Sequence, residues 1–521
     1  MQSASAELAE PQMHQLLVSL GVDVEYVRAE GNTLYLLDGN GAEVPVLDYA
    51  GGYGALILGH NHPAVVDRAR EFLDAGTPVL AQASRQPLAG RVAARLNTVL
   101  HREFDTAEPY YAVFSNSGAE SIEVAIKHAE FDRVLRIAAL RAEIAAHVEE
   151  ARAAVLAGTA GIAPGARAAA GVGADRDFDA VVGGIAAHND ELAARPPVFL
   201  ALEGSFHGKL AGSVQLTHNA SFRTPFAAMA APARFVPFDQ PDQLVKVIAD
   251  HRATALDVVV TDGVVDVVER AFPVFGAFLL EVIQGEGGIR VVSREFAARI
   301  QEACAAVDCP IVVDEIQSGM GRTGAFFASA HIGLRADYYA LAKSLGGGLV
   351  KTAVTLVREG RYRPEFELVH SSTFAKDTFS CAIALTVLDL LEADDGRVYR
   401  LAAYWGERLT ALFTALRRDF PDVVVDVRGR GLMLGLEFRD QSESTSPGIR
   451  QVALADSLGY VVSGHLLRHH RIRTFPTASA VNTLRFEPSV LLTDEEVDRL
   501  DVALRAVCGV LRDQDELRLF S

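Results

Sequence analysis

The sequence has little of what several large classes of protein depend on. Its 521 residues include four cysteines, Cys304, Cys309, Cys381 and Cys508. They are too few and too widely spaced for a disulfide framework, and none forms the close pairs of a zinc site. We therefore expect buried thiols, no metal centre and a reducing, cytoplasmic location.

Runs of basic residues are also absent. Lys and Arg number 49 against 67 Asp and Glu, which gives a formal net charge of −18. Nucleic-acid binding needs clustered Lys and Arg to neutralise phosphates. The sequence therefore predicts no nucleic-acid partner, although single arginines can still hold a small anionic ligand.

Long apolar stretches are missing as well. The most apolar segment, around residues 272–283, is shorter than a bilayer span and contains Pro273 and Glu281. The N-terminal residues lack the basic segment and apolar stretch of a secretory signal. We expect no membrane partner.

The composition does supply a large buried core, because half of the residues are hydrophobic and 22% are charged. The length allows roughly two to four domains. Short apolar runs alternate with helical stretches, at residues 111–114, 198–202, 277–283, 311–313 and 338–341. This alternation is typical of a parallel sheet that helices cover on both faces.

We predict an α/β protein with two domains. A large domain, residues 61–360, contains a mostly parallel central sheet covered by helices. The N-terminal segment, residues 1–60, and residues 361–521 form a smaller α+β domain, with short apolar runs that include residues 460–462. An excursion at about residues 133–197, partly rich in Ala and Gly, is inserted in the large domain as a flexible cover or a packed helical segment.

Lysine is scarce, with six residues in all: Lys127, Lys209, Lys246, Lys343, Lys351 and Lys376. Lys343 stands out because it follows an apolar run and precedes three consecutive glycines. We expect it at the end of a buried strand, where the backbone turns tightly. A desolvated lysine has a lowered pKa and can act as an amine nucleophile. The alternative is an ordinary lysine with its ammonium group in solvent.

A second motif, residues 311–324, brings Asp314 and Glu315 to the end of a predicted strand, where open α/β sheets bind ligands. A carboxylate there can keep a heteroaromatic nitrogen protonated. The glycines of this motif also match a dinucleotide fingerprint, which makes a nicotinamide-dependent enzyme the rival hypothesis. That fingerprint must start directly after a strand and end at a helix, and the surrounding residues meet neither condition.

Three further motifs carry polar or aromatic groups. Ser117-Gly118-Ala119 stands between a strand and a helix, where N–H groups and the helix dipole can hold a phosphate, although an ordinary serine cap is equally compatible. Phe206 could present its ring to a planar ligand, whereas the neighbouring histidine more often has a structural role. Arg485 lies in a strand-like run and requires a carboxylate from a ligand or from the protein.

Together, a phosphate cradle, an aromatic ring, a carboxylate and an isolated lysine describe a site for pyridoxal phosphate (PLP). The same residues resemble the class III aminotransferases of fold type I, which include ornithine, acetylornithine and 4-aminobutyrate aminotransferases. The motifs that carry the resemblance follow the family order over most of the chain: Gly59-His60-Asn61-His62-Pro63, Ser115–Glu120, Phe206-His207-Gly208, Glu281–Glu286, Asp314–Gly324, Lys343 and Leu484-Arg485-Phe486.

The resemblance implies roles for individual residues. Lys343 would attach the cofactor covalently and act as the base that moves the substrate proton. Asp314 would pair with the pyridine nitrogen, and Gln317 would bond the 3′-oxygen. The other implied cofactor contacts are Ser117, Gly118 and Ala119 at the phosphate, Phe206 and Ile316 on the two ring faces, His207, Glu281, and Thr373 from the second subunit of a homodimer. The implied substrate contacts are Tyr53, Glu286 and Arg485.

Two features depart from the family pattern. After Phe374 the family usually continues Gly-Gly-Asn-Pro, whereas this chain has Ala375-Lys-Asp-Thr. The excursion at 133–197 is longer than the usual link and is a candidate lid or wall of the acceptor pocket. Together with the low lysine content, it makes the chain similar to aminotransferases of actinobacterial natural-product pathways such as that of caerulomycin.

The predicted activity is a ping-pong transamination between an amino-acid donor and an aldehyde or ketone acceptor. A decarboxylation-dependent transaminase and an aminomutase are the alternatives, since relatives with these reactions share the motifs.

Overall fold

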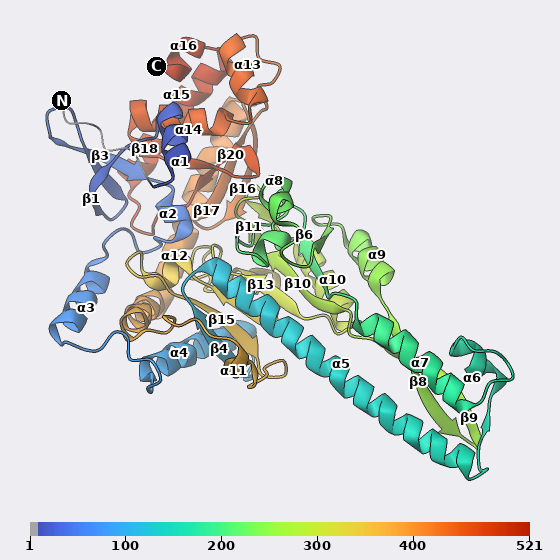
Figure 1. Cartoon of the computed structure of the whole chain (residues 1–521). Helices are drawn as coiled ribbons and strands as arrows, with labels where there is room; N and C mark the ends of the chain where they lie inside the picture. The colour runs from blue at the N-terminus through green and yellow to red at the C-terminus, as the bar shows by residue number, and fades with distance from the viewer. Residues whose placement is uncertain (1–8) are drawn as a thin grey trace.

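The structure is a computed structural model that describes residues 9–521 (Figure 1). The first eight residues of the predicted N-terminal segment lie outside the described residues. The central sheet has the strand order β4-β15-β14-β13-β10-β6-β7. In this order the strands are Tyr110–Ser115, Ala353–Arg358, Tyr338–Leu341, Ile311–Asp314, Phe275–Glu281, Val198–Leu202 and Ala233–Val236.

Strand directions in this sheet bring several carboxyl ends to one edge. β15 runs antiparallel to β14 and β4, whereas the pairs from β14 to β7 are parallel. β4 therefore points the same way as β14, and the loops after β4, β6, β10, β13 and β14 leave from the same edge. The predicted α/β class with a mostly parallel sheet is confirmed, and β15 is the strand that makes the sheet mixed.

Helices bury both faces of the sheet. Along β10, Phe278 and Leu280 pack into a cluster with α4 (Pro87–Phe104) and α10 (Arg294–Ala305). Ala277 and Leu279 pack into a second cluster with α5 (Gly118–Leu156). Because successive side chains of a strand point to opposite faces, a strand covered on both sides reads as a continuous apolar run. The main helices of the large part are α3 (Pro63–Asp74), α4 (Pro87–Phe104), α5 (Gly118–Leu156), α9 (Pro241–His251), α10 (Arg294–Ala305) and α12 (Thr378–Asp419).

The two chain ends share a smaller part of the molecule. β18 (Ile472–Arg473) pairs in parallel with β3 (Glu43–Asp48), which belongs to an N-terminal antiparallel sheet with β1 (Tyr26–Glu30) and β2 (Thr33–Leu37). A further antiparallel sheet has the order β16-β17-β20-β19. Its strands and the neighbouring helices are β16 (Val424–Arg430), β17 (Met433–Phe438), β20 (Ala480–Phe486), β19 (Phe475–Thr477), α13 (Pro447–Leu454), α14 (Leu458–His470) and α15 (Asp494–Arg512).

A long arm projects from the body (Figure 1). It consists of the C-terminal half of α5 with β5 (Gly161–Ile162), α6 (Pro164–Ala169), α7 (Phe178–Ala193), β8 (Thr254–Thr261) and β9 (Val264–Ala271). Its apolar side chains form a separate cluster, which includes Ile144, Val148, Val181, Ile185 and Val258. The excursion at 133–197 is therefore a packed helical segment, and the hairpin β8–β9 completes its core.

One local expectation needs correction, one element was missed, and the rejection of the dinucleotide fingerprint is confirmed. The apolar run 460–462, grouped above with strand-like runs, lies in α14 because the residues around it have one buried helical face. The hairpin β8–β9 was not predicted. The glycines between residues 319 and 324 lie in turns, and the next element is a short 3₁₀ helix, η3 (Ala328–Ile332), so the dinucleotide fingerprint lacks its helix.

No helix within residues 9–521 is long and apolar enough to cross a membrane. The domain boundaries at residues 60 and 360 stay a prediction.

The arm should unfold as a local unit. Val258 in β8 is 1% exposed and Val264 in β9 is 45% exposed. We expect Val258→Ala to destabilise the arm by about 2 kcal/mol, because two buried methyl groups are lost, and Val264→Ala to cost less than about 0.5 kcal/mol. Hydrogen exchange should rise in β8 and α7 and stay unchanged in the central sheet. An equal rise in both regions would contradict the local unit.

Candidate active site

The main cavity lies at the edge of the sheet where the parallel strands end, and its volume is about 700 Å³. Five of the segments that line it follow or end strands of the sheet. Asn116 to Ala119 follow β4, Phe206 to Lys209 follow β6, and Glu281 ends β10. Asp314 ends β13, Ile316 to Ser318 follow it, and Lys343 follows β14. Ligands in open α/β sheets bind at this kind of edge.

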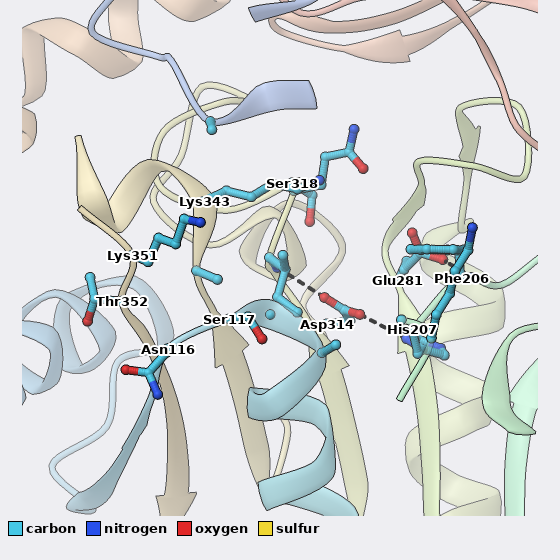
Figure 2. A pocket seen from close by; sticks show the side chains of 18 of the residues that line it. Asn116, Ser117, Phe206, His207, Glu281, Asp314, Ser318, Lys343, Lys351 and Thr352 are labelled. Atoms are coloured by element: carbon cyan, nitrogen blue, oxygen red, sulfur yellow. Dashed lines mark hydrogen bonds and ion pairs between the residues drawn. The ribbon is translucent and has the colours of Figure 1, made fainter. Parts of the chain in front are cut away.

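Asp314 is held in place by two donors. Its Oδ2 lies 2.8 Å from Nδ1 of His207, and its Oδ1 accepts a hydrogen bond from the Ile316 N–H at 3.1 Å. Figure 2 shows these contacts at the cavity wall. Burial lowers the pKa of His207, but the hydrogen bond and charge of Asp314 raise it by more, so the net shift is upward. The pair thus keeps a carboxylate oriented toward the cavity.

Glu281 stabilises this wall of the cavity by accepting hydrogen bonds from backbone N–H groups. Its two oxygens accept hydrogen bonds from the N–H groups of Phe206 at 2.8 Å and Gly285 at 2.9 Å. Burial raises the pKa of Glu281 to about 7, with His207 and Asp314 as its charged neighbours. This residue lines the cavity, and it also ties together the loops that follow β6 and β10.

Lys343 stands two positions after the end of β14, at the start of η4 (Lys343–Gly346). Its φ of 44° is in the left-handed region, which is uncommon for a residue with a side chain and is often found at functional sites. Burial lowers its pKa, and the charge of Glu487 is the largest influence in the opposite direction. The predicted position at the end of a buried strand, at a tight turn, is what the structure has.

The N-terminus of α5 closes one end of the cavity. Ser117 is its N-cap and accepts a hydrogen bond from the Glu120 N–H at 3.3 Å, so the ordinary serine cap is present. A Cβ on Gly118 would lie 2.9 Å from Ile316, and one on Gly208 would lie 2.7 Å from Ala119. Small residues therefore let three backbone segments meet where N–H groups and the helix dipole favour an anion.

The predicted substrate residues form a second cluster around Arg485. This arginine is buried, and its Nη2 forms a hydrogen-bonded ion pair with Glu286. Its Nε and Nη1 are buried without a partner among the described residues. The guanidinium carbon lies 5.0 Å from the ring centre of Tyr53, which is 45% exposed. The sequence left open whether a ligand or the protein supplies the carboxylate, and in this structure the protein supplies it.

The Arg485 cluster is not part of the cavity lining, and two further predicted features also do not reach this cavity within the single chain. Thr373 is not among the lining residues; its carbonyl accepts a bond from the Gln82 side chain at 3.5 Å. No lining residue from the described part of the chain belongs to the excursion 133–197, so the excursion does not line this chain's own cavity, and its role at the acceptor pocket stays a prediction. The excursion builds the arm instead. Glu315 also faces away and accepts bonds from Ser318, Ala328 and Ser329.

Sequence reasoning missed two charged residues. Glu487 is buried and bonds Gln317, although it stands only two positions after Arg485. An acidic residue in the otherwise apolar run around Phe486 was the available signal. Lys351 lines the cavity, and Figure 2 shows its ammonium group pointing into it. The scarcity of lysine was the available signal, because Lys351 is one of six lysines in the sequence.

The residues present fit PLP. The cavity has room for a small aromatic ligand, a helix N-terminus with small residues at one end, and a carboxylate and a lysine amine on its walls. Nε2 of His207 is buried without a hydrogen-bond partner among the described residues, and there is no room for a side chain at Gly118 or Gly208. Buried polar atoms are normally hydrogen-bonded, so this wall is suited to a polar ligand.

Comparison with known proteins agrees with this fit. The family model for aminotransferase class-III matches residues 19–505. An amine transaminase from an uncultivated Pseudomonas species, solved in a PLP-bound form, has a TM-score of 0.67 at 19% identity and covers 98% of both chains. The ornithine aminotransferase from Toxoplasma gondii has a TM-score of 0.66 at 21% identity, covering 98% of this chain and 94% of that one.

N-acetylornithine aminotransferase from Stenotrophomonas maltophilia is also similar, with a TM-score of 0.61, 24% identity and coverage of 96% and 99%. These structures share the fold type I architecture, and the family model covers nearly the whole chain. The chain therefore belongs to the class III aminotransferases, and it is a PLP-dependent enzyme that exchanges an amino group between an amino donor and a keto acceptor.

Proposed function

We propose that the enzyme moves an amino group from an amino-acid donor to an aldehyde or ketone acceptor in two half-reactions, with Lys343 as the catalytic base. The observation that carries this proposal is that Lys343 and Asp314 line one cavity, which the N-terminus of α5 closes. Bound there, PLP supplies an electron sink for the negative charge that develops on the substrate carbon.

Lys343 has the properties that proton transfer requires. Burial lowers the pKa of its ammonium group, so more of the neutral amine is present near neutral pH. A neutral amine can attack a carbonyl carbon and can accept a proton from a substrate carbon. Lys343 would therefore attach the cofactor and, in each half-reaction, move the proton between the α-carbon of the bound substrate and C4′ of the cofactor.

The remaining cofactor roles follow from the cavity walls. Asp314, oriented by His207, would keep a ring nitrogen protonated, because a carboxylate stabilises a positive charge beside it. We assign the ring faces to Phe206 and Ile316, and the 3′-oxygen to Gln317. The phosphate would be held by Ser117, Gly118 and Ala119, with Thr373 supplied by a second copy of the chain in a homodimer.

The ion pair between Arg485 and Glu286 supports a switch between two substrates. A donor carboxylate would bind Arg485 after Glu286 moves away, since the forked guanidinium matches a carboxylate bidentately. When an acceptor without that carboxylate binds, Glu286 would stay paired with Arg485, so that the charges of both side chains remain neutralised. Tyr53, next to the guanidinium, would contact either substrate.

We further propose a carbonyl compound of a natural-product pathway as the acceptor, on the basis of the sequence resemblance. A reducing cytoplasmic setting is supported by the four cysteines, which are free and buried.

Replacing Lys343 tests the central assignment. Lys343→Ala should abolish the visible absorption of the covalently attached cofactor, because the amine that binds the cofactor is gone. The rate of transamination should fall by about 10²-fold to 10⁴-fold, because the same amine moves the proton. The matched variant Lys351→Ala removes another cavity lysine and should keep the absorption band. If borohydride reduction fixed the cofactor to Lys351 or elsewhere, the assignment would be wrong.

The charge on His207 should make stability depend on pH in a defined direction. Its pKa is raised in the folded protein, so its stabilising contribution is complete below the unfolded value of about 6.5 and is lost as the pH rises through the folded pKa. The difference in melting temperature between the wild type and His207→Asn should therefore be larger in acid and shrink in alkali. A difference that stays constant over this range would contradict the buried imidazolium.

Arg485→Lys should weaken donor binding selectively. We expect KM for the amino-acid donor to rise by about 10-fold to 100-fold, because lysine cannot form the bidentate contact with its carboxylate. The effect on an acceptor that lacks a carboxylate should be smaller. Half-reactions started separately from the PLP and pyridoxamine forms would measure the two effects. Arg473→Lys, at an arginine bonded to Asp48, is the control. Release of CO₂, or an isomerised product without a keto acid, would contradict simple transamination.

A further inference from the structure

Glu487 is a buried acidic residue that none of these roles uses. It stands directly after β20 and is 0% exposed. Its Oε1 accepts a hydrogen bond from Nε2 of Gln317 at 2.6 Å, and its Oε2 is buried without a hydrogen-bond partner among residues 9–521. A buried carboxylate with a single hydrogen bond is costly and requires a compensating interaction.

Two glycines enclose the contact between Glu487 and Gln317. A Cβ on Gly54 would lie 3.3 Å from both Oε1 of Glu487 and Cγ of Gln317. A Cβ on Gly285 would lie 2.1 Å from Oε1 of Gln317. The amide of Gln317 is thus fixed at both ends, with its nitrogen on Glu487 and its oxygen against the Gly285 backbone. One N–H of this amide remains for a ligand in the cavity that Gln317 lines.

The charges that face Lys343 differ in how they are neutralised. Glu286 is bonded to Arg485, and Asp314 is bonded to His207. Glu487 has no such bonded cation, and it has the largest effect of these charges on the pKa of Lys343, acting upward against burial. Glu487 is therefore the carboxylate best able to stabilise a positive charge on the nitrogen of Lys343.

Besides Lys343 and Arg485, the cation Arg322 also interacts with the charge of Glu487. It is fully buried, and its guanidinium donates hydrogen bonds to the carbonyl oxygens of Leu432, Pro488 and Gly54 at 2.5 to 3.2 Å. These contacts fix Arg322 to three backbone segments. A purely structural role for Glu487 would be to balance this arginine, and that role predicts no effect on Lys343.

We propose that Glu487 is a positioning residue for transamination: its carboxylate orients the amide of Gln317 toward the cofactor's oxygen and holds positive charge on the nitrogen of Lys343. This inference rests on the proposed role of Lys343. Under this proposal Glu487, which directly follows β20 of the C-terminal sheet, affects the protonation of the Lys343 nitrogen as well as the local fold.

The test is the pH dependence of the visible absorption of the PLP-loaded enzyme, which reports protonation at the nitrogen of Lys343. Glu487→Gln keeps the shape and an oxygen acceptor for Gln317 but removes the charge. The midpoint of the titration should fall by about one pH unit, since a nearby negative charge favours the protonated form. Glu487→Asp, which keeps the charge, should restore most of the difference.

Glu103→Gln is the matched control, because this partly buried carboxylate accepts bonds from the N–H groups of Phe326 and Phe327 in another part of the protein. The midpoint of the absorption titration of Glu103→Gln should equal that of the wild type. If the midpoint of Glu487→Gln also equalled the wild-type value, while its melting temperature fell, Glu487 would be structural and the inference would be overturned. A wild-type absorption band that survived Lys343→Ala would overturn the proposed function instead.

Discussion

The parallel pairing of β6, β10, β13 and β14 is the constraint on which the site depends. Parallel strands end at the same edge of a sheet, so loops far apart in the sequence are brought to one place. β4, which points the same way, adds the N-terminus of α5 to this edge. Lys343, Asp314, His207 and Ser117 therefore share one cavity although they span more than two hundred positions of the chain.

The chemistry of the cavity and of the separate Arg485 cluster depends on how buried charges are paired. Asp314 is matched by His207, and Glu286 by Arg485. Both pairs leave polar atoms without partners among the described residues, at Nε2 of His207 and at Nε and Nη1 of Arg485. Buried groups of this kind cost free energy unless a ligand completes their contacts. The unmatched atoms therefore agree with a site built around a cofactor and a charged substrate.

The arm shows how a large insertion can be added without disturbing the site. Its elements come from two places in the sequence, residues 133–197 and the hairpin β8–β9, and they share an apolar cluster separate from those of the central sheet. Because α5 starts at the cavity and ends in the arm, one helix connects both parts (Figure 1). The excursion therefore extends the molecule and does not line this chain's own cavity.

Much of the fold and site followed from the sequence alone. The run from Tyr338 to Leu341, followed by Lys343 and glycines, predicted a lysine at a strand end, because apolar runs and glycine turns are local signals. Asp314 and the serine cap at Ser117 followed for the same reason. Contacts between distant segments were decided only by the tertiary structure. The bond from Gln317 to Glu487, the antiparallel direction of β15 and the hairpin that completes the arm each depend on which segments pack together, and no local pattern specifies that pairing.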